Sequence, residues 1–210
     1  MANAAALTAV ADQGGSCRGG RRGAADLLAV TVQLGRDPHP FARVVARCPF
    51  GFPAAVEDLP YGPSGEPFPT LYYLTCPTFV AAVSRLESAG GVRRWTGRAG
   101  DDPALRRSLV EAAAVSRRRR RALQARCAAP MSDGGASLDT GVAGVRDPAA
   151  VKCLHAHAAH ALAHPVYLFG RAVLAEVRDP WCADRRCAAL LASEQPGPAT
   201  ADAGTPGASA

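Results

Sequence analysis

The segment D-P-A-A-V-K-C-L-H-A-H-A-A-H-A-L-A-H-P (147–165) constrains the fold of this chain more than any other stretch. It carries four of the five histidines and one of the seven cysteines. Asp147, followed by a proline, is a helix-start signal and Pro165 is a stop signal, so the segment is predicted to form one helix. At about 100° per residue, the residues on one face, within roughly 60° of one another, are Cys153, His157, His160 and His164. Such a face is more typical of metal binding, or of polar chemistry in a cleft, than of plain packing.

Short apolar runs before this helix predict a small sheet. F-A-R-V-V-A-R-C (41–48) and P-A-A-V-E (53–57) flank a tight turn, and T-L-Y-Y-L-T (70–75) supplies β-branched and aromatic residues for a third strand. Further helices are predicted near 77–88, 102–126 and 171–177. We therefore expect an α+β fold in which a small antiparallel sheet, of about three strands, packs against four or so helices.

The ordered part of the chain is expected to be one domain. A length of 210 residues is enough for one domain with a core, and we place it at residues 28–190. Residues 1–27 are rich in Ala and Gly without periodicity, and residues 191–210 are of low complexity. We expect both terminal segments to be disordered.

The cysteine count and the hydropathy of the sequence indicate in which compartment the protein is located. Seven cysteines is an odd number, and the N-terminal stretch lacks the pattern of a secretory signal, so we expect reduced thiols. No apolar run approaches the roughly 20 residues that cross a bilayer. The sequence thus predicts a cytoplasmic protein that does not enter a membrane.

A basic run suggests a possible acidic partner. Residues 91–130 carry eleven arginines against three acidic residues, so this region is more basic than the whole chain, whose net charge is +6. The candidate polyanion-binding residues are Arg117, Arg118, Arg119, Arg120 and Arg121. A nucleic-acid partner is one interpretation of this run. A solvated helix face is the other, because no aromatic residue interleaves with the run and no nucleic-acid-binding motif accompanies it.

Cysteines at the ends of two predicted strands suggest a zinc site. Cys48 ends the first strand and Cys76 follows the third, so the sheet could bring the two thiols together. Zinc binds thiolate and imidazole tetrahedrally at roughly 2.0–2.3 Å, and Cys153 and His157, one helical turn apart, can reach one ion. The predicted ligands are therefore Cys48, Cys76, Cys153 and His157. His160 and His155 are alternates for the histidine position.

Other interpretations of these residues stay open. The three cysteines could be small buried hydrophobic residues. Cys76, placed just before a helix, could be a thiolate nucleophile. A three-ligand zinc with a bound water could make a hydrolase, with His155, His160 or Glu57 as acid or base. The sequence assigns no catalytic residue and no substrate.

Several motifs resemble one family. They are R-C-P-F-G-F-P (47–53), P-F-P-T-L-Y-Y-L-T-C-P (67–77), S-R-L-E (84–87) and V-K-C-L-H-A-H-A-A-H (151–160). Across residues 34–174 the chain resembles the bacterial, largely actinobacterial family called domain of unknown function 501. In that family, His replaces Cys76 in some relatives, an exchange that metal ligation tolerates. More relatives have a histidine at the positions of His155 and His160 than at the position of His157.

The resemblance implies no activity, although some relatives carry a septum-formation label. After His160 this chain departs from the family pattern, so no role is carried over for the segment that follows. We expect a metal-binding protein with a structural or interaction role and an unidentified protein partner. The alternatives are a metal- or cysteine-dependent hydrolase, and a polyanion-binding protein acting through the arginine-rich helix.

Overall fold

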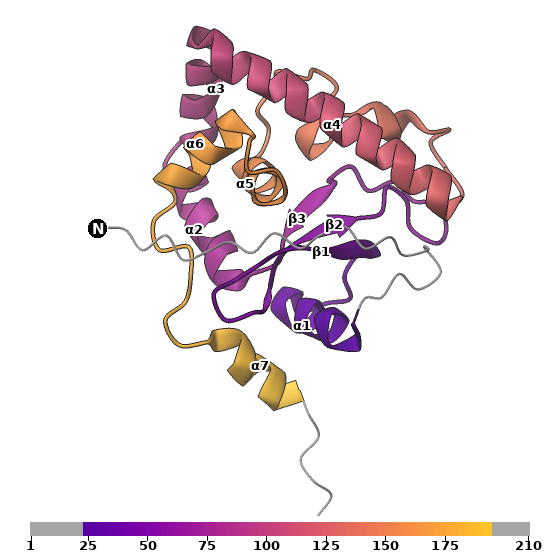
Figure 1. The fold of residues 1–210 in the computed structure, drawn as a ribbon, viewed down its shortest axis with the longest axis vertical. Coiled ribbons are helices and arrows are strands. Elements are labelled where there is room, and N and C mark those ends of the chain that lie inside the picture. The colour runs from indigo at the N-terminus through magenta and orange to yellow at the C-terminus, as the bar shows by residue number, and fades with distance from the viewer. Residues whose placement is uncertain (1–22, 195–210) are drawn as a thin grey trace, which may run out of the picture.

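The computed structural model describes residues 23–194 (Figure 1). Residues 1–22 and 195–210, which make up most of the two expected disordered tails, lie outside the described residues. The sheet consists of β1 (Phe41–Arg47), β2 (Pro53–Asp58) and β3 (Tyr72–Leu74). All neighbours are antiparallel in the order β1-β2-β3. The predicted α+β fold with a three-stranded antiparallel sheet is confirmed.

The β1–β2 turn forms where the sequence predicted it. Cys48 N–H donates to Phe52 O (2.9 Å), and Gly51 N–H donates back to Cys48 O (2.9 Å). Gly51 has φ of +85°, a conformation that suits glycine. All six residues of β2 are buried, as expected for the central strand of a sheet that is covered by helices.

The described residues contain seven α-helices, more than the four or so expected. They are α1 (Ala24–Leu34), α2 (Pro77–Ser88), α3 (Gly91–Asp101), α4 (Pro103–Cys127), α5 (Leu154–Ala163), α6 (Leu168–Glu176) and α7 (Arg186–Glu194). Two short 3-10 helices, η1 (Ala136–Asp139) and η2 (Val142–Gly144), lie between α4 and α5. α1, α3 and α7 were not predicted. α1 begins before residue 28 and α7 ends after residue 190, so both pass the expected domain boundaries.

Helix α5 is the hub of the molecule. Figure 1 shows it nearly end-on, among α2, α4, α6 and the sheet, and it contacts all three strands. Eight of its ten residues are buried. Its alanines allow close approach: a Cβ added to Gly170 of α6 would lie 2.7 Å from Ala161 Cβ. The alanine content of this helix therefore serves tight packing.

A buried ion cluster ties α4 to the sheet. Glu57 of β2 is fully buried and accepts hydrogen bonds from Arg119 Nε (2.6 Å) and Nη2 (2.8 Å) and from Arg43 Nε (2.9 Å). Tyr72 OH lies 3.3 Å from the same carboxylate. Although burial raises the pKa of Glu57, the hydrogen bonds and charges of Arg119 and Arg43 outweigh it, so the net pKa is lowered. Glu57 is therefore ionised and paired, as buried charges must be.

A second arginine of α4 is buried, and its partners are oxygen atoms of the backbone and of Thr140. Arg120 has no exposed surface, and its guanidinium donates to Thr140 O (2.8 Å) and to Pro69 O. Burial lowers the pKa of Arg120 to about 10, so it stays charged at neutral pH. These contacts hold the segment containing η1 and η2 against the start of β3 and against α4.

No helix within residues 23–194 has the length and apolar character needed to span a bilayer.

Replacing Arg119 tests the ion cluster. Arg119→Met removes the two-point partner of a fully buried carboxylate, so the free energy of unfolding should fall by about 2–4 kcal/mol. The matched control is Arg118→Met, because Arg118 is exposed on the same helix. It should change stability by less than about 0.5 kcal/mol. Urea denaturation followed by circular dichroism measures both, and equal losses in the two variants would contradict the proposed role of Arg119.

Candidate metal centre

Helix α5 begins at Leu154, and the prediction that it starts at Asp147 was wrong. Asp147 Oδ1 accepts from Ala149 N–H (2.9 Å), and Ala150 N–H donates to Asp147 O (3.1 Å), so the predicted cap closes a local turn instead. Cys153 is the residue before the helix and is extended, with φ of −153° and ψ of 121°. The helical spacing that paired Cys153 with His157 therefore does not apply.

Glu87 holds the N-terminal end of α5. It lies in the last turn of α2, and its Oε1 accepts from Leu154 N–H and, at 3.4 Å, from His155 N–H. The first amides of a helix have no partner within the helix, and its N-terminal end attracts negative charge. The Glu87 carboxylate meets both needs and connects α2 to α5.

The ring of His155 is oriented by backbone and side-chain contacts. Its Nε2 lies 3.2 Å from Val80 O and 3.1 Å from Ser84 Oγ. A carbonyl oxygen only accepts hydrogen bonds, so Nε2 carries the proton and donates it. Nδ1 faces the opposite way, 3.2 Å from Glu87 Oε1 and 3.8 Å from Cys153 Sγ. This is the arrangement in which a second contact fixes the tautomer of a metal-binding histidine.

The three side chains have the geometry of a metal site. Glu87, Cys153 and His155 each offer one ligand atom, and these three atoms lie within 4.8 Å of one another. Bond lengths to a tetrahedral zinc put ligand atoms about 3.3 Å apart for N and O and about 3.6 Å apart for N and S. The observed separations are 3.2 Å and 3.8 Å. Within residues 23–194 this is the group of three His, Cys, Asp or Glu side chains that could hold a metal ion.

Without a metal ion, the groups around His155 favour the protonated form of its ring. Partial burial lowers the pKa of His155, but the contacts with Cys153, Glu87 and Val80 O outweigh it and raise the pKa to about 9. A proton thus sits on Nδ1, where a metal ion would otherwise sit. The His155 and Glu87 side chains are 23% and 24% exposed, so solvent reaches the site and a water could complete its coordination.

The structure places the other predicted ligands elsewhere. Cys48 lies just after β1 and Cys76 just before α2, and both thiols are buried. Burial, with smaller effects of Cys187 and Cys48, raises the pKa of Cys76 to about 11. Neither cysteine belongs to the converging group around Cys153. Of the predicted residues, the structure brings together Cys153 and the alternate His155.

The remaining histidines of α5 are inside the protein. His157 is 1% exposed, and its Nδ1 contacts Tyr167 OH at 2.7 Å. Burial lowers the pKa of His157 to about 3, which is typical of a neutral core histidine. His160 is 2% exposed, and its Nδ1 lies 3.5 Å from Ser116 Oγ.

Glu87 was missed by sequence reasoning about the site. It ends the motif S-R-L-E, which carries the family resemblance but was given no role. Glu87 and Cys153 are 66 residues apart, so no local spacing links them. The one available signal was an acidic residue within a distinctive motif near a helix end.

Two of the five consecutive arginines have partners inside the protein, and a third forms an ion pair at the surface. Arg119 pairs with Glu57, Arg120 binds carbonyl oxygens, and Arg121 contacts Asp139. Arg117 is half-buried and Arg118 is exposed. Arg119 and Arg120 are therefore not part of a solvated helix face, because Glu57 of β2 and backbone carbonyls such as Thr140 O accept from them. Arg118 and Arg121 are exposed to solvent.

Comparison with known proteins gives one match. A family model described as "Protein of unknown function (DUF501)" matches residues 44–175. Glu87, Cys153 and His155 all lie within the matched range. No curated protein and no solved structure matches.

The raised pKa of His155 predicts a pH dependence of stability in metal-free protein. A histidine whose pKa rises from 6.5 unfolded to about 9 folded stabilises the fold fully below pH 6.5, and this contribution is lost as the pH passes 9. The free energy of unfolding should therefore fall between these values, and the fall should be smaller in Glu87→Gln.

NMR titration of the His155 ring measures the same group directly. The midpoint should move from about 9 toward the ordinary value of 6.5 in Glu87→Gln. An unchanged midpoint in this variant would show that Glu87 does not act on His155.

Proposed function

The chain belongs to the family described as protein of unknown function DUF501, and we propose that it is a zinc-binding protein in which one ion joins α2 to α5. The ligands are Glu87, Cys153 and His155, with water in the fourth position. The observation that carries the proposal is the convergence of three ligand atoms within 4.8 Å beside a histidine whose other nitrogen donates to Val80 O.

The donor set favours zinc among the common metals. Magnesium and calcium prefer oxygen ligands, whereas zinc accepts thiolate, imidazole and carboxylate together. One thiolate and one carboxylate supply two negative charges, which balance Zn²⁺ when His155 is neutral. Cys153 is a free thiol, as a zinc ligand must be before it binds the ion.

The position of the site supports a structural or interaction role. Two of the ligands stand at the start of α5, the hub helix, and the third at the end of α2. An ion there would fix the orientation of α5 against α2. The cavity of about 290 Å³ between α4 and the end of α5 is not lined by any of the three ligands. A zinc-water hydrolase would need a substrate cavity beside its metal.

Thiol chemistry is the second candidate, and one contact favours it. Cys153 precedes the N-terminal end of a helix and lies 3.8 Å from His155 Nδ1, so a thiol and an imidazole are paired as thiol chemistry requires. Cys76, the nucleophile candidate of the sequence, has little support because burial raises its pKa to about 11. Polyanion binding has less support than the sequence suggested, since two arginines of the run, Arg119 and Arg120, have partners inside the protein.

Zinc titration of metal-free protein tests the proposal. Isothermal titration calorimetry should show one zinc per chain for the wild type. Cys153→Ala or Glu87→Gln removes a ligand and should weaken binding by at least about 100-fold. Binding should also tighten as the pH rises, because the ion displaces protons from His155 and Cys153.

The control separates this site from the ligand set predicted by the sequence. Cys48→Ala should leave zinc affinity unchanged. A loss of binding in Cys48→Ala would favour the set that contains Cys48 and Cys76. If the wild type binds no zinc, while iodoacetamide modifies Cys153 rapidly near neutral pH, the thiol interpretation replaces the metal site.

A further inference from the structure

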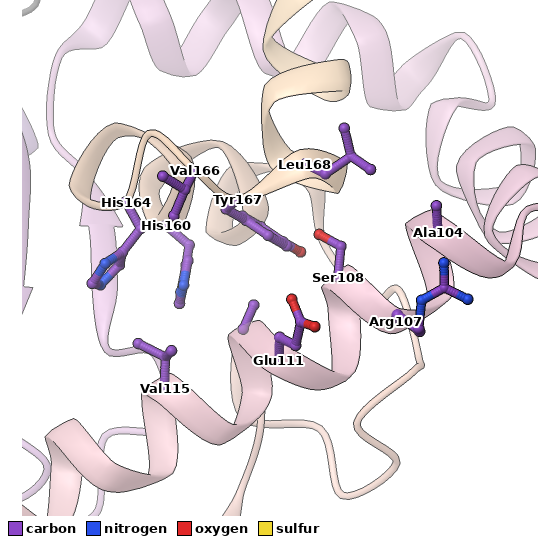
Figure 2. A pocket seen from close by; sticks show the side chains of 11 residues that line it. Ala104, Arg107, Ser108, Glu111, Val115, His160, His164, Val166, Tyr167 and Leu168 are labelled. Atoms are coloured by element: carbon purple, nitrogen blue, oxygen red, sulfur yellow. The ribbon is translucent and has the colours of Figure 1, made fainter.

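A cavity of about 290 Å³ lies between α4 and the turn that joins α5 to α6 (Figure 2). One wall is a face of α4 that includes Arg107, Glu111 and Val115. The opposite wall includes His160 of α5 and Tyr167 of the turn. Its volume is near the lower end of the range for small-molecule sites, which suits a ligand with one ring.

The buried side chain of His160 presents one ring nitrogen to this cavity. The side chain is 2% exposed, and its Nδ1 faces Ser116 Oγ. Its Nε2 has no hydrogen-bond partner within residues 23–194, yet it is not sealed from solvent as His157 Nε2 is. Figure 2 shows the ring directed into the space above Val115. A buried polar atom without a partner is costly unless a ligand or water meets it.

His160 meets a ligand as a neutral group. Burial, with smaller effects of His164, His157 and Arg120, holds the pKa of His160 well below its usual range. The deep end of the cavity therefore offers a neutral hydrogen-bonding atom and apolar walls. A charged group of a ligand would lose its hydration there without a countercharge.

Two side chains of opposite charge lie at the rim of the cavity. Arg107 and Glu111 are both exposed, and neither forms an ion pair within residues 23–194. They are four residues apart on α4, so they project from neighbouring turns on one face. Figure 2 shows the Glu111 carboxylate directed toward the cavity, with Arg107 one turn nearer Ala104. The rim thus presents a cation and an anion side by side.

We propose that this cavity binds an aromatic α-amino acid. The carboxylate of the ligand pairs with Arg107 and its ammonium group with Glu111. The ring lies against Ala112 and Val115, and a polar ring substituent, such as a phenol, bonds His160 Nε2.

The charges of the rim select a zwitterion over other ligands. A simple anion would face Glu111 and a simple cation would face Arg107, each at a cost in repulsion. An uncharged ligand would use neither rim charge. A zwitterion with its charges at one end satisfies both and leaves its ring for the apolar part of the cavity. The site is separate from the metal centre, because none of the three metal ligands lines it.

Titration with L-tyrosine tests the proposal by calorimetry and by shifts of the His160 ring signals in NMR. We expect saturable binding. Tyramine, which lacks the carboxylate, and hydroxyphenylpropionate, which lacks the ammonium group, should bind at least about tenfold more weakly. L-phenylalanine should also bind more weakly, because it leaves His160 Nε2 unpaired.

Variants at the rim locate the site without touching the core. Arg107→Met and Glu111→Gln should each weaken L-tyrosine binding at least about tenfold. Arg106→Met is the matched control, since Arg106 is exposed on α4 but does not line the cavity, and it should bind as the wild type does. The absence of L-tyrosine binding, or binding that both rim variants leave unchanged, overturns the proposal. Equal affinity for either one-charge analogue overturns the zwitterion assignment.

Discussion

The contact between the Glu87 carboxylate and the N-terminal end of α5 is the interaction on which the arrangement of this protein depends. One oxygen accepts from Leu154 N–H and His155 N–H and lies 3.2 Å from the His155 ring. It thereby fixes where α5 begins, and α5 contacts all three strands, α2 and α6. The same oxygen helps to raise the pKa of His155 and faces the thiol of Cys153. Helix capping, histidine protonation and metal binding therefore share one carboxylate.

Sequence patterns predicted elements well where local chemistry decides them. The β1–β2 hairpin, β3, α2 and α4 lie close to their expected positions because turn residues, β-branched runs and Pro at the first helical turn act locally. The start of α5 was misplaced because an Asp-Pro pair can close a turn as well as cap a helix. The contacts of the arginine run of α4 were not predicted, for a different reason. Its acceptors, Glu57 and the carbonyls of Thr140 and Pro69, come from distant parts of the chain, and helical periodicity carries no information about them.

The candidate site was predicted in part. Cys153 and the alternate His155 are two of its three members, and they were found because soft metals need sulfur and nitrogen donors. The predicted ligand set of Cys48, Cys76, Cys153 and His157 required the sheet to bring the thiols of Cys48 and Cys76 close to α5. In the structure, burial accounts for these three residues: two are thiols in the core and one is a neutral histidine bonded to Tyr167. Glu87 escaped notice because acidic residues near helix ends are common, and only the packing of α2 against α5 gives this one a ligand's position.

X-ray absorption at the zinc edge, on protein loaded with one equivalent of zinc, tests the central claim most directly. Zinc held by Cys153, His155, Glu87 and water gives one sulfur at about 2.3 Å and three nitrogen or oxygen atoms at about 2.0–2.2 Å. Two or three sulfurs around the ion would contradict this account and would place the metal among the cysteines of the sheet.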